Sequence, residues 1–138
     1  MLIAFNKPFG VLCQFSGEGP TLAHFIDVPS VYPAGRLDKD SEGLLLLTDE
    51  GALQARISSP KFKQPKTYLV LVERVPDGIT LERLRRGFEL NGTPTRAATV
   101  RRLPEPEDLW PRNPPVRYRK NVEDAWLELI LTEGRNRQ

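Results

Sequence analysis

Short runs of apolar residues predict the first strands of the chain. Residues 2–5 form one run, and residues 11–15 form another after a turn that contains Pro8 and Gly10. Four consecutive leucines within residues 43–48 predict a strand buried on both faces, because the run is too short for a helix of its own. We therefore expect a hairpin-like start followed by a buried strand.

Helical patterns in the chain are brief. Thr21 is placed to cap a short helix that ends near residue 26. The turn and acidic residues before residue 52 predict a helix over about residues 52–57. A third helix is expected to begin at Thr80, with its apolar stripe facing inward and Gly87 near its end.

The second half of the chain predicts further strands. Residues 67–72 are rich in β-branched and aromatic side chains, and residues 95–103 and 126–132 alternate well enough for two more strands. Asn91-Gly92 is a strong hairpin signal just before the second of these. Residues 104–120 contain several prolines and few periodic apolar positions, which predicts an insertion or a long ordered loop.

These elements favour an α+β fold with a mixed, largely antiparallel sheet and a few flanking helices. Strands and helices do not alternate regularly enough for a doubly wound parallel sheet. At 138 residues the chain has room for one ordinary domain, or for two small lobes that share a core. We expect residues 1–138 to form a single domain.

The composition narrows the classes of function. With one Cys and one His in the chain, Cys13 has no partner for an internal disulfide and a protein-built zinc site is implausible. Any catalysis is therefore expected to be metal-free. No apolar run approaches the length of a membrane span or a secretory signal, which predicts a cytoplasmic protein without membrane contact, and we expect a monomer.

The distribution of charge says more than the net value of +2. Most of the 20 basic residues are arginines, and cations outnumber acids near the C-terminal end. The cations of this part are Arg112, Arg117, Arg119, Lys120, Arg135 and Arg137. Such an excess suits contacts with a phosphate backbone, and these six residues are candidates for RNA binding. A solvated, proline-stiffened surface loop is the competing interpretation of residues 112–120.

Asp38 is the first candidate for chemistry. It lies between Arg36 and Lys39 on a loop that leads into the leucine-rich strand, where nearby cations can keep a carboxylate ionised. Most such acids in loops serve turns or surface ion pairs. The local pattern alone therefore leaves both interpretations open.

A longer string carries a resemblance to a known family. Residues 35–51, GRLDKDSEGLLLLTDEG, resemble the signature of the RsuA/RluB/RluE group of ribosomal pseudouridine synthases. Similar agreement holds for residues 6–10 (NKPFG), 66–68 (KTY) and 133–138 (EGRNRQ), in the same order and at similar spacing. The resemblance thus covers nearly the whole chain. Residues 110–117 further resemble the branch of the family that modifies 23S rRNA of the large subunit.

The resemblance implies both a fold and a reaction. It implies the pseudouridine synthase catalytic fold, with an active-site cleft across the sheet, and isomerisation of uridine to pseudouridine without a cofactor. Asp38 matches the catalytic residue, Tyr68 the active-site tyrosine that packs on the target uracil, and Arg36 a support for the loop or its charge. Whether Asp38 attacks carbon or removes a proton stays open. Lys7 and Lys66 are candidates for phosphate contacts.

The resemblance also sets expectations about substrate and chain length. The expected partner is 23S rRNA, with small-subunit rRNA, tRNA or non-catalytic RNA binding as alternatives. In the family the last string continues into further arginines, a helix and a closing strand, whereas this chain stops at Gln138. We therefore expect a catalytic domain shortened at its C-terminus, without an S4-type RNA-binding domain.

Overall fold

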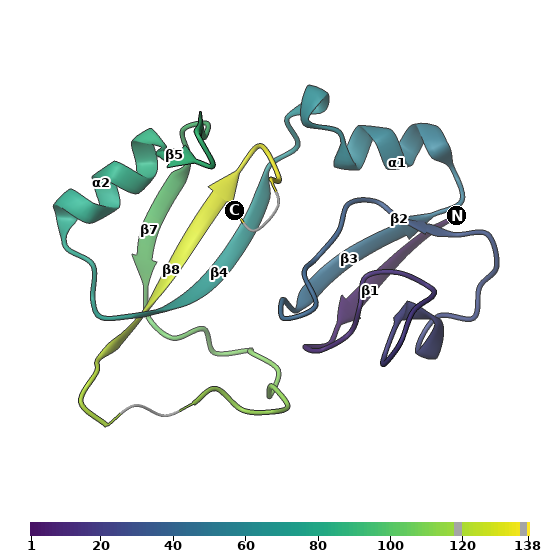
Figure 1. Cartoon of the computed structure of the whole chain (residues 1–138), viewed down its shortest axis with the longest axis horizontal. Coiled ribbons are helices and arrows are strands. Elements are labelled where there is room, and N and C mark those ends of the chain that lie inside the picture. Colours follow the sequence, from purple (N-terminus) through teal and green to yellow (C-terminus); the bar gives the residue numbers. More distant parts are fainter. Residues whose placement is uncertain (118–119, 136–137) are drawn as a thin grey trace. The chain divides into compact units, whose positions relative to one another are not determined.

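A computed structural model of the chain describes residues 1–117, 120–135 and 138. It divides the chain into two compact units (Figure 1). The first unit comprises residues 1–64 together with Arg112–Pro114, and the second comprises Pro65–Pro111 and Pro115–Gln138. Each unit has its own three-stranded antiparallel sheet.

The first sheet has the strand order β1-β3-β2, built from β1 (Leu2–Lys7), β3 (Gly43–Thr48) and β2 (Tyr32–Pro33). β1 pairs antiparallel with β3 over its whole length, from Leu2 opposite Thr48 to Lys7 opposite Gly43. Side chains alternate between the two faces of a strand. One face therefore carries the core, which gathers Val11, Cys13, Leu22, Ile26, Val31, Leu45 and Leu47.

Two predictions for this unit are corrected. β3 is not buried on both faces along its whole length, because Leu45 and Leu47 are in the core whereas Leu44, on the other face, is 68% exposed. Residues 11–15 form no strand, although Leu12 makes an isolated bridge with Thr21. Their backbone instead bonds to the segment around Thr21, since Leu12 N donates to Pro20 O and Leu22 N to Gln14 O.

Short helices complete the first unit. The 3-10 helix η1 (Leu22–His24) begins at Thr21, whose hydroxyl accepts from Ala23 N, so the predicted cap is confirmed. His24 closes the same cap, because its Nδ1 accepts from Thr21 N at 3.1 Å. α1 (Gly51–Ser58) packs against β3 and is followed by the 3-10 helix η2 (Pro60–Phe62) (Figure 1).

The second sheet has the order β4-β8-β7, built from β4 (Lys66–Glu73), β8 (Asp124–Leu131) and β7 (Thr99–Leu103). α2 (Gly78–Arg86) lies along β7 (Figure 1), and Arg85 Nε donates to Val100 O at 2.9 Å. The Asp77 carboxylate caps α2 by accepting from Thr80 N at 2.7 Å. The helix expected from Thr80 therefore begins two residues earlier.

The predicted hairpin is present but the strand after it is shorter than expected. β5 (Glu89–Leu90) and β6 (Thr93–Pro94) are joined by Asn91 and Gly92, whose φ angles of +51° and +79° suit such a turn. Residues 95–98 do not continue into β7. Their backbone bonds elsewhere, because Thr95 N donates to Phe88 O and Ala98 N to Arg85 O.

The architecture confirms the α+β fold with antiparallel sheets. The described residues between β7 and β8 form no helix or strand, in agreement with a long loop over residues 104–120. Among the described residues, no helix is long and apolar enough to cross a membrane.

Candidate active site

Asp38 lies in the loop that connects β2 to β3. This loop is bounded by Gly35 and Gly43, which have φ angles of +95° and +123° that side chains disfavour. Within the loop Ser41 N donates to Asp38 O at 3.0 Å, which forms a tight turn. Asp38 is half-buried. The two glycines therefore allow a compact loop that presents a carboxylate at the end of the buried strand.

A buried lysine contacts the backbone of the Asp38 loop. The Lys7 side chain, at the end of β1, is completely buried, and its ammonium donates to Val11 O at 2.8 Å and to Pro8 O at 2.9 Å. It also lies 3.4 Å from the carbonyl oxygen of Lys39, the residue that follows Asp38. Three carbonyls thus surround one cation, and one of them belongs to the Asp38 loop.

The electrostatics of Lys7 connect it to the acids of this loop. Burial lowers the pKa of the Lys7 ammonium, because the charged form loses solvation. Coulombic interactions with Cys13, Glu42, Asp40 and Asp38 oppose that shift, in decreasing order. Three carboxylates of the loop therefore stabilise the charged form of Lys7. The same attraction holds the loop close to the ammonium.

The prediction that Lys7 contacts RNA phosphate is wrong for this structure. A completely buried ammonium that already donates to backbone carbonyls has no surface to offer to RNA. The pattern of residues 6–10 did not reveal this, because lysine is rarely buried unless partners compensate it. Those partners come from a turn and from residue 39, which lies 32 positions away along the chain.

The turn after β1 also contacts the Asp38 loop through its backbone. Gly10 N donates to Lys39 O at 2.8 Å, so this oxygen accepts from both Gly10 and Lys7. Gly10 has a φ of +85°, which glycine adopts without strain. The turn and the Asp38 loop are therefore held together by two hydrogen bonds to one carbonyl.

The guanidinium of Arg36 contacts the segment that follows the turn after β1. Its Nη2 donates to Gln14 Oε1 at 3.3 Å, and the side chain is exposed. This contact joins the Asp38 loop to the segment after β1. A direct effect of Arg36 on the Asp38 charge stays a prediction.

Tyr68 and Lys66 lie on β4 in the second unit. Alternation along the strand places Lys66, Tyr68 and Val70 on one face, and all three are half-buried. Tyr68 is opposite Leu129 of β8 in the antiparallel register. The aromatic ring and the lysine thus share one side of the second sheet.

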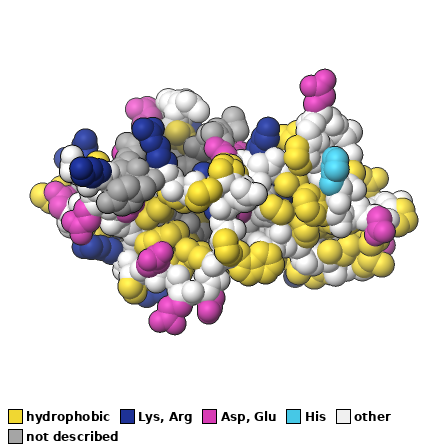
Figure 2. Space-filling model, turned by 90° about the horizontal axis from the view of Figure 1, so that it is seen from below, with side chains coloured by type: hydrophobic (Ala, Val, Ile, Leu, Met, Phe, Trp, Pro, Cys, Tyr) yellow, Lys and Arg dark blue, Asp and Glu magenta, His cyan; other side chains and the backbone are white. Residues whose placement is uncertain are grey.

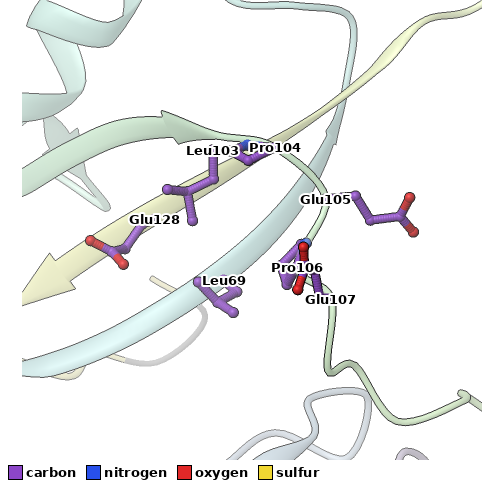
Figure 3. Close-up of a pocket in the computed structure, with 7 residues that line it drawn as sticks. All are labelled: Leu69, Leu103, Pro104, Glu105, Pro106, Glu107 and Glu128. Carbon is purple, nitrogen blue, oxygen red and sulfur yellow. The ribbon is translucent and has the colours of Figure 1, made fainter.

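The other face of β4 borders an open depression. Leu69 and Glu128 line it from the sheet, together with Leu103, Pro104, Glu105, Pro106 and Glu107 (Figure 3). Three carboxylates at this surface repel phosphate. None of the residues predicted for catalysis or RNA binding lines this depression, so it is a poor candidate for the RNA site.

The predicted RNA-binding cations have different environments. Arg112 lies over the Phe9 ring, with its guanidinium carbon 4.0 Å from the ring centroid. Arg117 and Lys120 are exposed and available to a phosphate backbone. Arg135 instead donates to the carbonyls of Leu90, Thr93 and Pro94, which favours a structural role at the β5–β6 hairpin. Arg119 and Arg137 lie outside the described residues.

The structure distributes the candidate residues between the two units. Asp38, Arg36, Lys7 and Arg112 belong to the first unit, and Tyr68 and Lys66 belong to the second. On the face drawn in Figure 2, Lys and Arg side chains are interspersed with Asp and Glu side chains. Sequence reasoning missed Phe9 and Gly10 as individual contributors, although both lie in the NKPFG string. Among the described residues, no group of His, Cys, Asp and Glu is arranged to hold a metal ion.

Comparisons with known proteins agree with the motif. A ribosomal large subunit pseudouridine synthase E from Xanthomonas axonopodis pv. citri (strain 306) is 59% identical over 142 aligned residues, which cover the whole chain and 75% of the relative. The protein of the same name from Vibrio vulnificus (strain CMCP6) is 54% identical, over 99% of the chain and 59% of that relative.

A solved structure and a family comparison extend this agreement to the fold. The crystal structure of a pseudouridylate synthase superimposes with a TM-score of 0.76 at 33% identity, and the match covers 98% of this chain and 52% of that one. All of residues 1–138 match the family described as RNA pseudouridylate synthase. The chain therefore belongs to the RNA pseudouridylate synthase family.

Proposed function

We propose that the protein isomerises a specific uridine to pseudouridine in the 23S rRNA of the large ribosomal subunit. The observation that carries this proposal is the Asp38 loop. It has the family signature, and the buried Lys7 contacts its backbone at Lys39 O. The high identity to relatives named for large-subunit modification supports the choice of substrate. We propose further that the protein acts as a monomer in the cytoplasm.

Asp38 is the proposed catalytic residue. The reaction breaks the bond between ribose C1′ and uracil N1, turns the base, and forms a bond between C1′ and uracil C5. Ionised Asp38 either attacks the ribose carbon or removes a ribose proton, and both roles require a carboxylate. The charge of Asp38 is among those that oppose the lowering of the Lys7 pKa, so the proposed catalytic carboxylate interacts with the buried cation.

Tyr68 is the proposed partner of the target base. A uridine within paired or stacked RNA hides its glycosidic bond, so the nucleotide must turn out of the stack before reaction. An aromatic side chain compensates for part of the lost stacking. Once the base has turned, C5 carries a hydrogen that must leave as a proton, and the Tyr68 hydroxyl is proposed to assist that step.

The reaction is an isomerisation with no net oxidation or reduction. The atoms of the product are those of the substrate, and the proton lost from C5 is balanced by the proton gained at N1. We therefore propose catalysis by side chains alone. Arg117, Lys120 and Lys66 are proposed to contact the RNA backbone outside the reacting nucleotide.

The substrate is tested by mapping pseudouridines in ribosomal RNA. A strain that lacks the gene is compared with the same strain carrying the wild-type gene, and with one carrying the Asp38→Asn variant. We expect one pseudouridine of the large-subunit RNA to disappear in the deletion strain and to return with the wild-type gene alone. An unchanged large-subunit profile, or a loss confined to small-subunit RNA or tRNA, would refute the proposed substrate.

A further inference from the structure

One contact links the arginine-rich loop to the turn beside Asp38. The guanidinium of Arg112 lies over the Phe9 ring at 4.0 Å, and its Nε donates to Pro114 O at 2.9 Å. Arg112–Pro114 cluster with the first unit, although the flanking residues of this loop belong to the second. The contact thus lies inside the unit that carries Asp38.

The Phe9 ring belongs to the same turn that binds the Asp38 loop. Its neighbour Gly10 donates to Lys39 O at 2.8 Å, and Lys39 follows Asp38 directly. The Arg112 guanidinium therefore contacts the Phe9 ring, and the next residue, Gly10, is hydrogen-bonded to the catalytic loop at Lys39 O. A ligand atom bound by Arg112 would have a defined position relative to that loop.

We propose that Arg112 and Phe9 form a phosphate clamp for the RNA strand that flanks the target nucleotide. The proposal rests on the proposed function and names a specific contact within it. The Phe9 ring fixes the plane of the guanidinium from one side, and the Pro114 carbonyl occupies Nε. Each of the two Nη groups can still donate, and a guanidinium fork matches the geometry of a phosphate.

The charges around Arg112 favour an external anion. Among the described residues, no carboxylate lies within ion-pair distance of its guanidinium. By contrast, Arg101 is paired with Glu128, and Arg85 and Arg86 are paired with Glu82. Arg112 thus combines a fixed orientation with an uncompensated charge, which is what a preformed phosphate site requires.

The test is a double-mutant cycle on RNA binding. Phe9→Leu removes the aromatic face and keeps an apolar side chain, Arg112→Ala removes the guanidinium, and the two are combined. Affinity for a fluorescent, single-stranded oligouridylate is measured at several salt concentrations with the full chain. Arg117→Ala is the matched control, because Arg117 lies in the same loop and is exposed.

The clamp predicts coupling between the two residues. Phe9→Leu weakens binding about two- to fivefold, the value of an exposed cation–π contact, and has no further effect once Arg112 is Ala. Arg112→Ala reduces the slope of log affinity against log salt by about 0.7, as expected for one phosphate on a single strand. In the Arg117→Ala background, Phe9→Leu keeps its full effect. Arg112→Lys keeps the salt slope but loses the coupling to Phe9.

Two results would overturn the clamp. One is an equal effect of Phe9→Leu in the presence and absence of Arg112, and the other is an unchanged salt slope in Arg112→Ala. Phe9→Trp guards against an effect of folding, because it keeps an aromatic face and should retain the coupling. Binding to oligouridylate does not require pseudouridine formation. The two proposals are therefore tested separately. Oligouridylate binding tests the clamp, and pseudouridine formation in 23S rRNA by the wild-type protein tests the reaction.

Discussion

The ammonium of Lys7 lies 3.4 Å from the carbonyl oxygen of Lys39, and Lys39 follows the proposed catalytic Asp38. Gly10 N donates to the same oxygen at 2.8 Å. A carbonyl that accepts from a buried cation and from a backbone amide is held more firmly than one that faces water. The end of β1 thus determines where the Asp38 loop lies.

Replacing Lys7 by Met tests this support. The change keeps a long apolar side chain but removes the donor, so the carbonyls of Pro8, Val11 and Lys39 lose a partner, and the contact with Val11 is buried. We expect the free energy of unfolding to fall by about 1–3 kcal/mol and pseudouridine formation to fall with it. Urea denaturation and an assay on 23S rRNA provide the two measurements.

Lys61→Met is the control for Lys7→Met, because Lys61 is exposed. Its unfolding free energy should change by no more than about 0.5 kcal/mol. Wild-type stability and activity in Lys7→Met would contradict a supporting role for the buried lysine.

Two substitutions at Tyr68 separate the ring from the hydroxyl. Tyr68→Phe keeps the stacking surface, so we expect RNA affinity to be retained while the rate falls about 100-fold, as for loss of a proton-transfer group. Tyr68→Leu should in addition weaken RNA binding by about 1–3 kcal/mol, because base stacking is lost. Single-turnover kinetics measure the rate and the affinity separately. Tyr32→Phe is the control, because the Tyr32 side chain is exposed, and equal losses in it and in Tyr68→Phe would count against a catalytic hydroxyl.

The Arg101–Glu128 pair predicts a pH dependence of stability. Hydrogen bonds from Arg101, at 2.8 and 3.2 Å, hold the pKa of the Glu128 carboxyl below its usual range. A carboxyl with a lowered pKa in the folded state stabilises the fold above the usual glutamate pKa. That contribution is lost as the pH falls through the lower, folded-state value.

Arg101→Gln tests this contribution. The variant should be less stable than wild type at about pH 6, and the difference should shrink toward about pH 3. Urea midpoints across this range measure it. Arg102→Gln is the control, because Arg102 is exposed on the same strand opposite Leu127. A difference between wild type and Arg101→Gln that does not change with pH would exclude the pair as its cause.

The sequence predicted the elements that depend on local patterns. β-Branched and aromatic content identified β4, and strand alternation identified β8. The Asn91-Gly92 pair identified the hairpin, and Thr21 identified the cap of η1. Each of these signals lies within a few neighbouring residues. The resemblance over residues 35–51 added the reaction, which local patterns alone did not reveal.

Contacts between distant segments were not predicted from the sequence. Burial of Lys7 depends on the carbonyl of Lys39, and the carbonyls that engage Arg135 lie more than 40 residues away. The sequence alone does not distinguish a lysine or arginine that donates to backbone carbonyls within the protein from one that binds phosphate. The stacking of Arg112 on Phe9 was missed for the same reason.

The central claim is that Asp38 is the catalytic residue, and Asp38→Asn tests it most directly. The amide has nearly the same shape as the carboxylate but can neither attack the ribose carbon nor accept its proton. Tritium release from 23S rRNA labelled at uracil C5 should be abolished in this variant, while its RNA affinity and thermal stability remain close to those of wild type. Tritium release at the wild-type rate would remove Asp38 from the mechanism.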